Sequence, residues 1–218
     1  MPDRPFADNA CALLSSALLA DVLDALGHRS SALPPEVRPL KPGWKILGRA
    51  ATLCAVPVAA EPTHPYAVEM DCIDALKPGQ VLVATTSGDR GSALWGELLS
   101  TACQARGAVG VVMDGLTRDA VRIMALDFPV FAAGFSPLDS KGRLDGISHG
   151  QPIRLGACVV RPGDWIFGDM DGVVAVPARL ADAAFARALE KATGENTVRA
   201  ELAKGRSVRA VFEQYGIL

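Results

Sequence analysis

The sequence has little of several features that mark specialised classes of protein. Its 218 residues carry a net charge of only −2, so no basic surface for nucleic acid is expected. No apolar run is long enough to cross a membrane. No glycine-rich nucleotide-binding loop follows an early strand. These absences argue against a nucleic-acid-binding protein, a membrane-spanning protein and a protein with a glycine-rich nucleotide-binding site.

Cysteine is also scarce, and its pattern excludes two kinds of site. The five cysteines are an odd number, are scattered, and lack metal-ligand spacing, so we expect neither a zinc site nor a disulfide framework. The apolar residues 10–20 are not expected to be a signal peptide, because Asp3 and Asp8 offset Arg4 and the pattern continues through acidic positions. We therefore expect a cytoplasmic protein. The cysteines are Cys11, Cys54, Cys72, Cys103 and Cys158.

Half of the residues are hydrophobic, which is enough for one large core. Helical and strand periodicities alternate along the chain, which is typical of an α/β fold. Helices are expected over residues 15–27, 67–76 and 121–126, and strands over residues 48–58, 80–86, 128–132, 151–160, 165–167 and 173–176. Residues 136–150 are expected to be irregular and to order only at a subunit contact. Residues 178–192 and 195–204 predict two helices interrupted at Gly194.

Residues 91–119, reading GSALWGELLSTACQARGAVGVVMDGLTRD, are the most informative stretch. Apolar residues recur with a helical period from Leu94, which predicts a helix that begins near Ala93 and ends at Gly107. Residues 108–113 form a short apolar run typical of a strand buried on both faces. Arg118 and Asp119 follow at the carboxyl end of that strand, where ligands collect in α/β sheets.

These residue types can form a pocket for a small 2-oxo acid. The first amides of the helix favour an anion, and Gly96 lets a ligand approach the backbone. Arg118 offers a planar fork of donors that matches a carboxylate. Asp119 is a hard oxygen ligand, and Glu97 could hold water bound to a metal such as Mg²⁺. A metal so placed would stabilise the enolate formed when a bond beside the carbonyl breaks.

Each residue also has a purely structural explanation. Arg118 and Asp119 are also compatible with a surface ion pair or a turn cap. Glu97 near a helix start would complement the helix dipole, and Gly96 would permit close helix packing. The combination favours function, because the helix start and the Arg-Asp pair bracket one helix–strand unit.

The segments WGELL, ARGAVGVVMDG and RD resemble the RraA-like family, which includes the class II 4-hydroxy-4-methyl-2-oxoglutarate aldolases. Its signature is an acidic residue, twenty intervening residues, and Arg-Asp; twenty residues lie between Glu97 and Arg118. The acid is Glu here, where the characterised aldolases have Asp. PGDWIFGDMDGVVAVP near residues 162–177 also resembles the family.

The resemblance implies a layered α/β/β/α sandwich formed by a single domain over residues 1–218, assembled as a homotrimer or a dimer of trimers. It implies substrate contacts from Gly96, Glu97, Leu98, Leu99 and Arg118, and a divalent metal, Mg²⁺ or Mn²⁺, on Asp119. Arg118 and Glu97 would be the catalytic side chains, with Arg118 offsetting enolate charge and Glu97 positioning a water for proton transfer. The implied activity is a lyase that releases pyruvate from 4-hydroxy-2-oxo acids and also decarboxylates oxaloacetate.

Two other functions stay open at this stage. One is a regulator that binds and inhibits a ribonuclease, as the family's namesake does; the other is a metal enzyme acting on a different small acid or sugar-derived substrate. The loop around His64 fits the aldolases less well, and His64 is either near the pocket or simply exposed. The tail from about residue 178 to 218 is expected at a subunit interface. Glu195 there would complete a neighbour's site or pair with Arg199.

Overall fold

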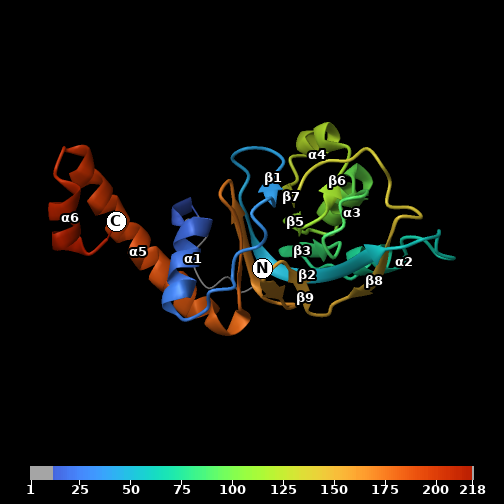
Figure 1. Ribbon diagram of the computed structural model, residues 1–218, viewed down its shortest axis with the longest axis horizontal. Coiled ribbons are helices and arrows are strands. Elements are labelled where there is room, and N and C mark those ends of the chain that lie inside the picture. The colour runs from blue at the N-terminus through green and yellow to red at the C-terminus, as the bar shows by residue number, and fades with distance from the viewer. Residues whose placement is uncertain (1–11, 218) are drawn as a thin grey trace.

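The computed structural model describes residues 12–217, so Cys11 and the first part of the apolar run 10–20 lie outside the described residues. An eight-stranded sheet is the centre of the fold, with strand order β1-β7-β5-β3-β2-β11-β12 and β8 paired with β2 (Figure 1). The neighbours β2, β3, β5 and β7 are parallel, whereas β1, β8, β11 and β12 pair antiparallel. The strands are β1 (Arg38–Pro39), β2 (Ile46–Pro57), β3 (Gln80–Thr85), β5 (Gly110–Met113), β7 (Val130–Ala132), β8 (Leu144–His149), β11 (Trp165–Asp169) and β12 (Gly172–Val176).

The long strand β2 lets the sheet curve back on itself. One edge of β2 pairs with β3, while the other edge pairs first with β11 and then with β8. Two additional pairs complete the β structure: β9 (Ile153–Leu155) with β10 (Cys158–Val160), and β4 (Ala93–Trp95) with β6 (Leu116–Thr117). The sheet is therefore nearly closed and encloses an apolar interior.

Three apolar clusters show how the layers stack. The first joins one face of β2, β3 and β5 to the helices α2 (Ala67–Asp74), α3 (Glu97–Ala105) and α4 (Ala120–Leu126). The second joins β11 and β12 to α1 (Ser16–Ala25) and α5 (Ala181–Ala203). The third lies between the two halves of the sheet. The arrangement is the expected α/β/β/α sandwich, with helices on the two outer faces (Figure 1).

The first helix is fixed at its start by polar contacts. Ser15 is the N-cap of α1, and its side chain accepts a hydrogen bond from the Leu18 amide. The Asp169 carboxylate accepts hydrogen bonds from the Ser16 amide and hydroxyl at 2.9 and 2.6 Å. It also accepts one from the Asp171 amide, so this acidic pair serves a tight turn and anchors α1 to the β11–β12 hairpin.

Several expected boundaries are wrong. The helix expected from Ala93 begins at Glu97, because residues 93–95 extend to pair with β6. Residues 136–150 are not all irregular, since β8 lies there and pairs with β2 within the same chain. The strand expected over 151–160 is a hairpin of β9 and β10 that turns at Gly156.

The C-terminal region is also more regular than expected. Gly194 does not interrupt a helix but lies inside α5, because the backbone hydrogen bonds continue past it. The α5 helix runs outward from the sheet and carries α6 (Val208–Tyr215) at its far end (Figure 1). Val208 and Phe212 of α6 are about half exposed. Whether this tail lies at a subunit interface stays a prediction. Across residues 12–217, no helix combines the length and apolar character needed to cross a membrane.

Candidate active site

The pairing of β4 with β6 brings Glu97 and Arg118 close together in space, although twenty residues separate them in the sequence. These two strands run parallel just beyond the carboxyl ends of β3 and β5. The Arg118 amide donates to the Trp95 carbonyl at 2.9 Å, and the Thr117 hydroxyl donates to the same oxygen at 3.2 Å. The start of α3 and the Arg-Asp pair therefore lie side by side, at the sheet end where ligands are expected.

The start of α3 is held by a short chain of hydrogen bonds. The Trp95 indole donates to the Ser100 hydroxyl at 2.9 Å, and that hydroxyl donates to the Gly96 carbonyl at 3.0 Å. The Ser100 amide donates to the same carbonyl, which is the first backbone bond of the helix. The three amides of residues 97–99 consequently have no acceptor inside the helix. The Glu97 amide donates to an Asp119 carboxylate oxygen at 3.3 Å, which leaves two amides for a ligand.

Gly96 is required by the closeness of Asp119. A Cβ atom at this position would lie 2.8 Å from Asp119 Oδ2 and 3.4 Å from the Arg118 side chain. The backbone φ of −153° is open to any residue, so the restriction comes from space and not from conformation. Glycine therefore allows the Asp119 carboxylate to approach the helix start.

Asp119 presents its carboxylate to the cleft and not to its own helix. It is the N-cap of α4 in the left-handed conformation, with φ of 58°, but its side chain makes no capping hydrogen bond. Its side chain is 41% exposed. A carboxylate that is fixed by its neighbours yet open to solvent is available as a ligand.

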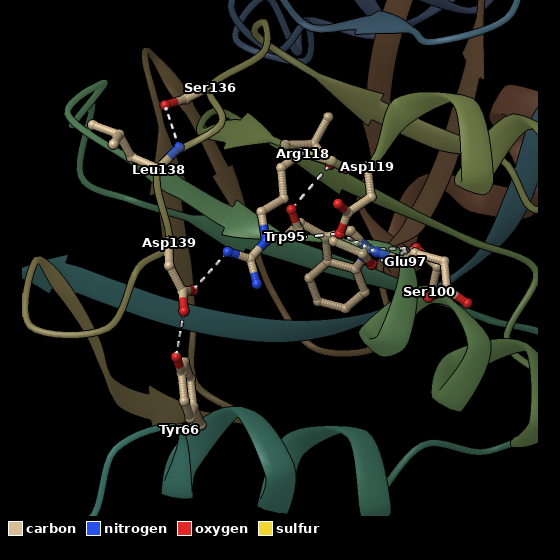
Figure 2. A network of polar contacts seen from close by, with 11 residues as sticks. Tyr66, Trp95, Glu97, Ser100, Arg118, Asp119, Ser136, Leu138 and Asp139 are labelled. Atoms are coloured by element: carbon tan, nitrogen blue, oxygen red, sulfur yellow. Dashed lines mark hydrogen bonds and ion pairs between the residues drawn. The ribbon is translucent and has the colours of Figure 1, made fainter.

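Arg118 lies between two carboxylates (Figure 2). Its Nε is 3.7 Å from Asp119 Oδ2, and its Nη1 is 3.4 Å from Asp139 Oδ1. Asp139 also accepts a hydrogen bond of 2.9 Å from the Tyr66 hydroxyl, so Tyr66, Asp139 and Arg118 form one connected network. Both ion-pair distances are longer than an ordinary hydrogen bond, so the guanidinium group keeps N–H donors for an incoming anion.

The Tyr66 hydroxyl remains a hydrogen-bond donor over the whole ordinary pH range. Burial, the hydrogen bond to Asp139 and the charge of Asp139 raise its pKa to about 12. Tyr66 is the N-cap of α2 and has a left-handed backbone, with φ of 65°. This conformation is uncommon for a bulky residue and is characteristic of positions that the surrounding structure fixes.

These residues surround a cleft of about 300 Å³. Of the sequence-predicted residues, Gly96, Leu98, Leu99, Arg118 and Asp119 all line it. Sequence reasoning did not assign the remaining lining residues to the site. Tyr66, Met70, Asp139 and Ser140 are distant in the sequence and belong to no local motif. Ala93, Leu94 and Trp95 directly precede Gly96, but their apolar spacing predicts that they belong to the helix.

Three predicted side chains do not point into the cleft. The Glu97 amide faces Asp119, but its carboxylate accepts a hydrogen bond from the Thr101 hydroxyl one turn along α3. His64 is exposed in the loop before α2 and does not line the cleft. Glu195 on α5 lies 4.0 Å from Lys191, and Arg199 pairs with Asn196, so the expected Glu195–Arg199 pair is not formed. The alternative role of Glu195, in the site of a neighbouring subunit, stays a prediction.

The donor set fits a divalent metal that takes most of its ligands from water and substrate. Among residues 12–217, no group of three or more His, Cys, Asp and Glu side chains could enclose a metal ion. Mg²⁺ is commonly bound by one or two carboxylates together with water and substrate oxygens. Asp119 supplies one exposed carboxylate beside Arg118, which agrees with that kind of site.

Comparison with known proteins gives consistent results. The model of the family described as RraA-like (Aldolase/RraA) matches residues 16–175. A protein of Halalkalibacterium halodurans named "Putative 4-hydroxy-4-methyl-2-oxoglutarate aldolase" is 32% identical over 203 residues, which is 92% of this chain and 91% of that protein. Protein DlpA of Legionella pneumophila is 27% identical over 201 residues; the match covers 92% of this chain but only 32% of DlpA.

The fold is similar to a solved structure from the same family. RraAS2 of Streptomyces coelicolor, described as an unusual member of the RNase ES inhibitor RraA protein family, superposes with a TM-score of 0.78. The two sequences are 28% identical, and the superposition covers 90% of this chain and 98% of that chain. The similar proteins thus include one named as an enzyme and one named after an inhibitor family.

Proposed function

The chain belongs to the RraA-like family, and on that premise we propose that it is a divalent-metal-dependent lyase that releases pyruvate from 4-hydroxy-2-oxo acids. Substrates of the 4-hydroxy-4-methyl-2-oxoglutarate type are proposed, with oxaloacetate decarboxylation as a second activity. One observation carries the proposal. Arg118 and Asp119 lie beside the free amides of α3 at a cleft of about 300 Å³, the size of a small organic acid site.

The carboxylate of the 2-oxo acid has two sets of donors in this cleft. The amides of Leu98 and Leu99 lack acceptors inside α3 and carry the positive end of the helix dipole. Arg118 offers guanidinium donors beside them. A carboxylate bound by both sets of donors would be held in a fixed orientation, which aligns the bond to be broken.

Asp119 would hold the Mg²⁺ or Mn²⁺, which would supply Lewis-acid polarisation of the 2-oxo group. In the retro-aldol step the hydroxyl on carbon 4 loses its proton and becomes the carbonyl of the second oxo acid. The bond between carbons 3 and 4 breaks, and its electron pair gives the enolate of pyruvate, which then takes a proton on carbon 3. Arg118 stabilises the negative charge that develops beside it.

Glu97 is proposed to position the water that takes the hydroxyl proton and returns a proton to carbon 3, in agreement with its place in the family signature. Its carboxylate hydrogen-bonds to Thr101 and must change rotamer to face the cleft. The side chain is half-buried at the first position of α3, so such a change moves no backbone atom. In oxaloacetate decarboxylation the same carbon–carbon bond breaks, carbon dioxide leaves, and the same enolate takes the proton.

A non-catalytic regulator that binds a ribonuclease is the second candidate function. The similarity to RraAS2, a member of an inhibitor family by its description, favours it. The intact Arg118–Asp119 pair with its free helix amides favours the lyase, since a binding surface does not need these groups to converge on a small cleft. For either function we propose a homotrimer or a pair of trimers, with the α5–α6 tail at a subunit contact.

The first test is pyruvate release from oxaloacetate by the full chain, with Mg²⁺ or Mn²⁺ and with excess chelator. We expect release that requires the metal and is lost in Asp119→Ala, while the thermal unfolding of this variant stays close to that of the wild type. Asp24→Ala is the matched control, because it removes an exposed carboxylate on α1, which does not line the cleft. Metal-independent release, or full activity in Asp119→Ala, would refute the assignment. Absence of both release and metal binding would favour the regulator.

A further inference from the structure

The cleft combines a few charged side chains with a mainly hydrophobic lining. Its charged side chains are Arg118, Asp119 and Asp139, and the Tyr66 hydroxyl links Asp139 to the start of α2, the helix that carries Met70. The remainder of the lining is mainly hydrophobic and includes Met70 and Leu98, whose exposed fractions are 52% and 77%. Large hydrophobic side chains gathered in one exposed cleft indicate a surface that binds an apolar group.

The described lining of the cleft has one cationic side chain, which two carboxylates accompany, and the divalent ion proposed on Asp119 would be occupied by the 2-oxo group of the substrate. Arg118 is the only Lys, Arg or His side chain among the described lining residues. If it binds the carboxylate beside the 2-oxo group, no lining cation remains for a second carboxylate on the substrate. A second carboxylate would then be transferred from water into the cleft without gaining a cationic partner there, which costs binding free energy.

Two cations that follow the lining residues Asp139 and Ser140 in the sequence have other partners. Lys141 follows the lining residue Ser140, but its Nζ lies 2.9 Å from Glu61 Oε1. The Arg143 guanidinium donates to the Asp139 backbone carbonyl at 2.9 Å. To reach a substrate, either side chain would have to give up its present contact.

Asp139 adds repulsion to this lack of attraction. The Tyr66 hydroxyl and Arg118 position its carboxylate at the cleft wall. Because Tyr66 has a pKa of about 12, it stays an uncharged donor and does not change the negative charge of the wall. A dicarboxylic substrate would bring its outer carboxylate into a cleft whose wall already carries this charge.

We infer that the cleft prefers 4-hydroxy-2-oxo acids that carry an uncharged, apolar group on carbon 4 over dicarboxylic ones. The inference rests on the proposed lyase function and specifies its substrate class. The hydrophobic lining of Met70, Leu98 and Leu99 would contact the apolar group, and Asp139 would be the residue that disfavours a carboxylate there.

Two substrates that differ in one group test the inference. In 4-hydroxy-4-methyl-2-oxopentanoate a methyl group replaces the outer carboxylate of 4-hydroxy-4-methyl-2-oxoglutarate. Cleavage of the first gives pyruvate and acetone, and cleavage of the second gives two pyruvates, so turnover is counted per bond broken. We expect kcat/KM of the metal-loaded full chain to be at least about tenfold higher for the methyl compound. Equal values, or a preference for the dicarboxylate, would overturn the inference while the lyase function stands. Release of pyruvate from neither compound would refute the lyase function itself.

A substitution at Met70 locates the apolar group. Met70→Lys places a cation on the hydrophobic side, and Met70→Gln is the matched uncharged control of similar length. Met70 is half exposed on α2, so both variants are expected to fold. Met70→Lys should shift the ratio of kcat/KM toward the dicarboxylate by roughly tenfold relative to Met70→Gln. The same ratio in both variants would show that the carbon 4 substituent does not lie against this wall.

Discussion

Gly96→Ala tests the geometry of the site with a single added carbon atom. The new Cβ would lie 2.8 Å from Asp119 Oδ2, so the carboxylate must retreat to at least about 3.4 Å for ordinary contact. Asp119 would then lose its place at the helix start and its hydrogen bond from the Glu97 amide. Since a displacement of about 1 Å at a reacting centre can cost about a hundredfold in rate, we expect kcat/KM to fall by roughly tenfold or more.

The same substitution has little reason to unfold the protein. The backbone φ of −153° suits alanine, and the loss of glycine at an N-cap costs about 1 kcal/mol or less. For a chain of this length, that cost lowers Tm by about 2–4 °C. The effect should therefore be large in activity and metal binding and small in stability.

Gly91→Ala is the matched control. A Cβ there would lie 3.4 Å from the nearest atom, an oxygen of Asp89, which is ordinary contact. The assays are pyruvate release, titration with Mn²⁺ by calorimetry, and thermal unfolding of both variants. If Gly96→Ala keeps the wild-type activity and metal affinity, the close approach of Asp119 to α3 is unimportant and the proposed site is wrong.

Three further predictions follow from single contacts. Arg118→Lys should lower kcat/KM by about a hundredfold or more, because an ammonium cannot form the bidentate pair with a carboxylate; wild-type kinetics would place the substrate carboxylate elsewhere. Tyr66→Phe removes the hydrogen bond to Asp139 and should raise KM severalfold, with a loss of about 1 kcal/mol in the free energy of unfolding. In the wild type, the pKa of the Tyr66 hydroxyl is about 12, so this group should cause no change in activity between pH 8 and about pH 11. Glu69→Gln should raise Tm at pH 8 by about 2–4 °C, because the Glu69 side chain is 1% exposed and its Oε2 atom has no hydrogen-bond partner. Burial raises the pKa of Glu69 above 4.5, so the native state loses stability as the pH rises through that raised pKa; a stabilisation by Glu69→Gln that persists unchanged below pH 4.5 would contradict this cause.

Local signals in the sequence predict most of the elements well. The apolar runs of β3 and β5 are buried on both faces, as their composition indicates. The start of α1 at Ser15 follows from capping chemistry. By contrast, the helical period across residues 94–105 misplaces the start of α3. Leu94 and Trp95 are buried in β4, and Leu98 is exposed at the cleft. The apolar residues that suggest one continuous helix therefore belong partly to a strand and partly to α3.

Pairing partners explain the other wrong boundaries. Residues 144–149 have few apolar side chains and become a strand because the free edge of β2 offers them hydrogen bonds. Gly194 weakens a helix by propensity, yet packing keeps α5 continuous, since buried residues on both sides of it, such as Ala192 and Val198, belong to the same helix. A strand edge or a packing surface elsewhere in the chain cannot be read from a local window.

The sequence by itself determines the α/β class, the family, and the half of the candidate site that a local motif carries: Gly96, and Arg118–Asp119 after a buried strand. Only the tertiary structure decides that Tyr66 and Asp139 join them and that Glu97 turns its carboxylate toward Thr101. The physical reason is the range of the interactions. Capping, periodicity and turn chemistry act over a few residues. The β4–β6 pairing and the packing of α2 against β8 instead bring together distant parts of the chain, such as Tyr66 and Asp139, which share a hydrogen bond although they are 73 positions apart.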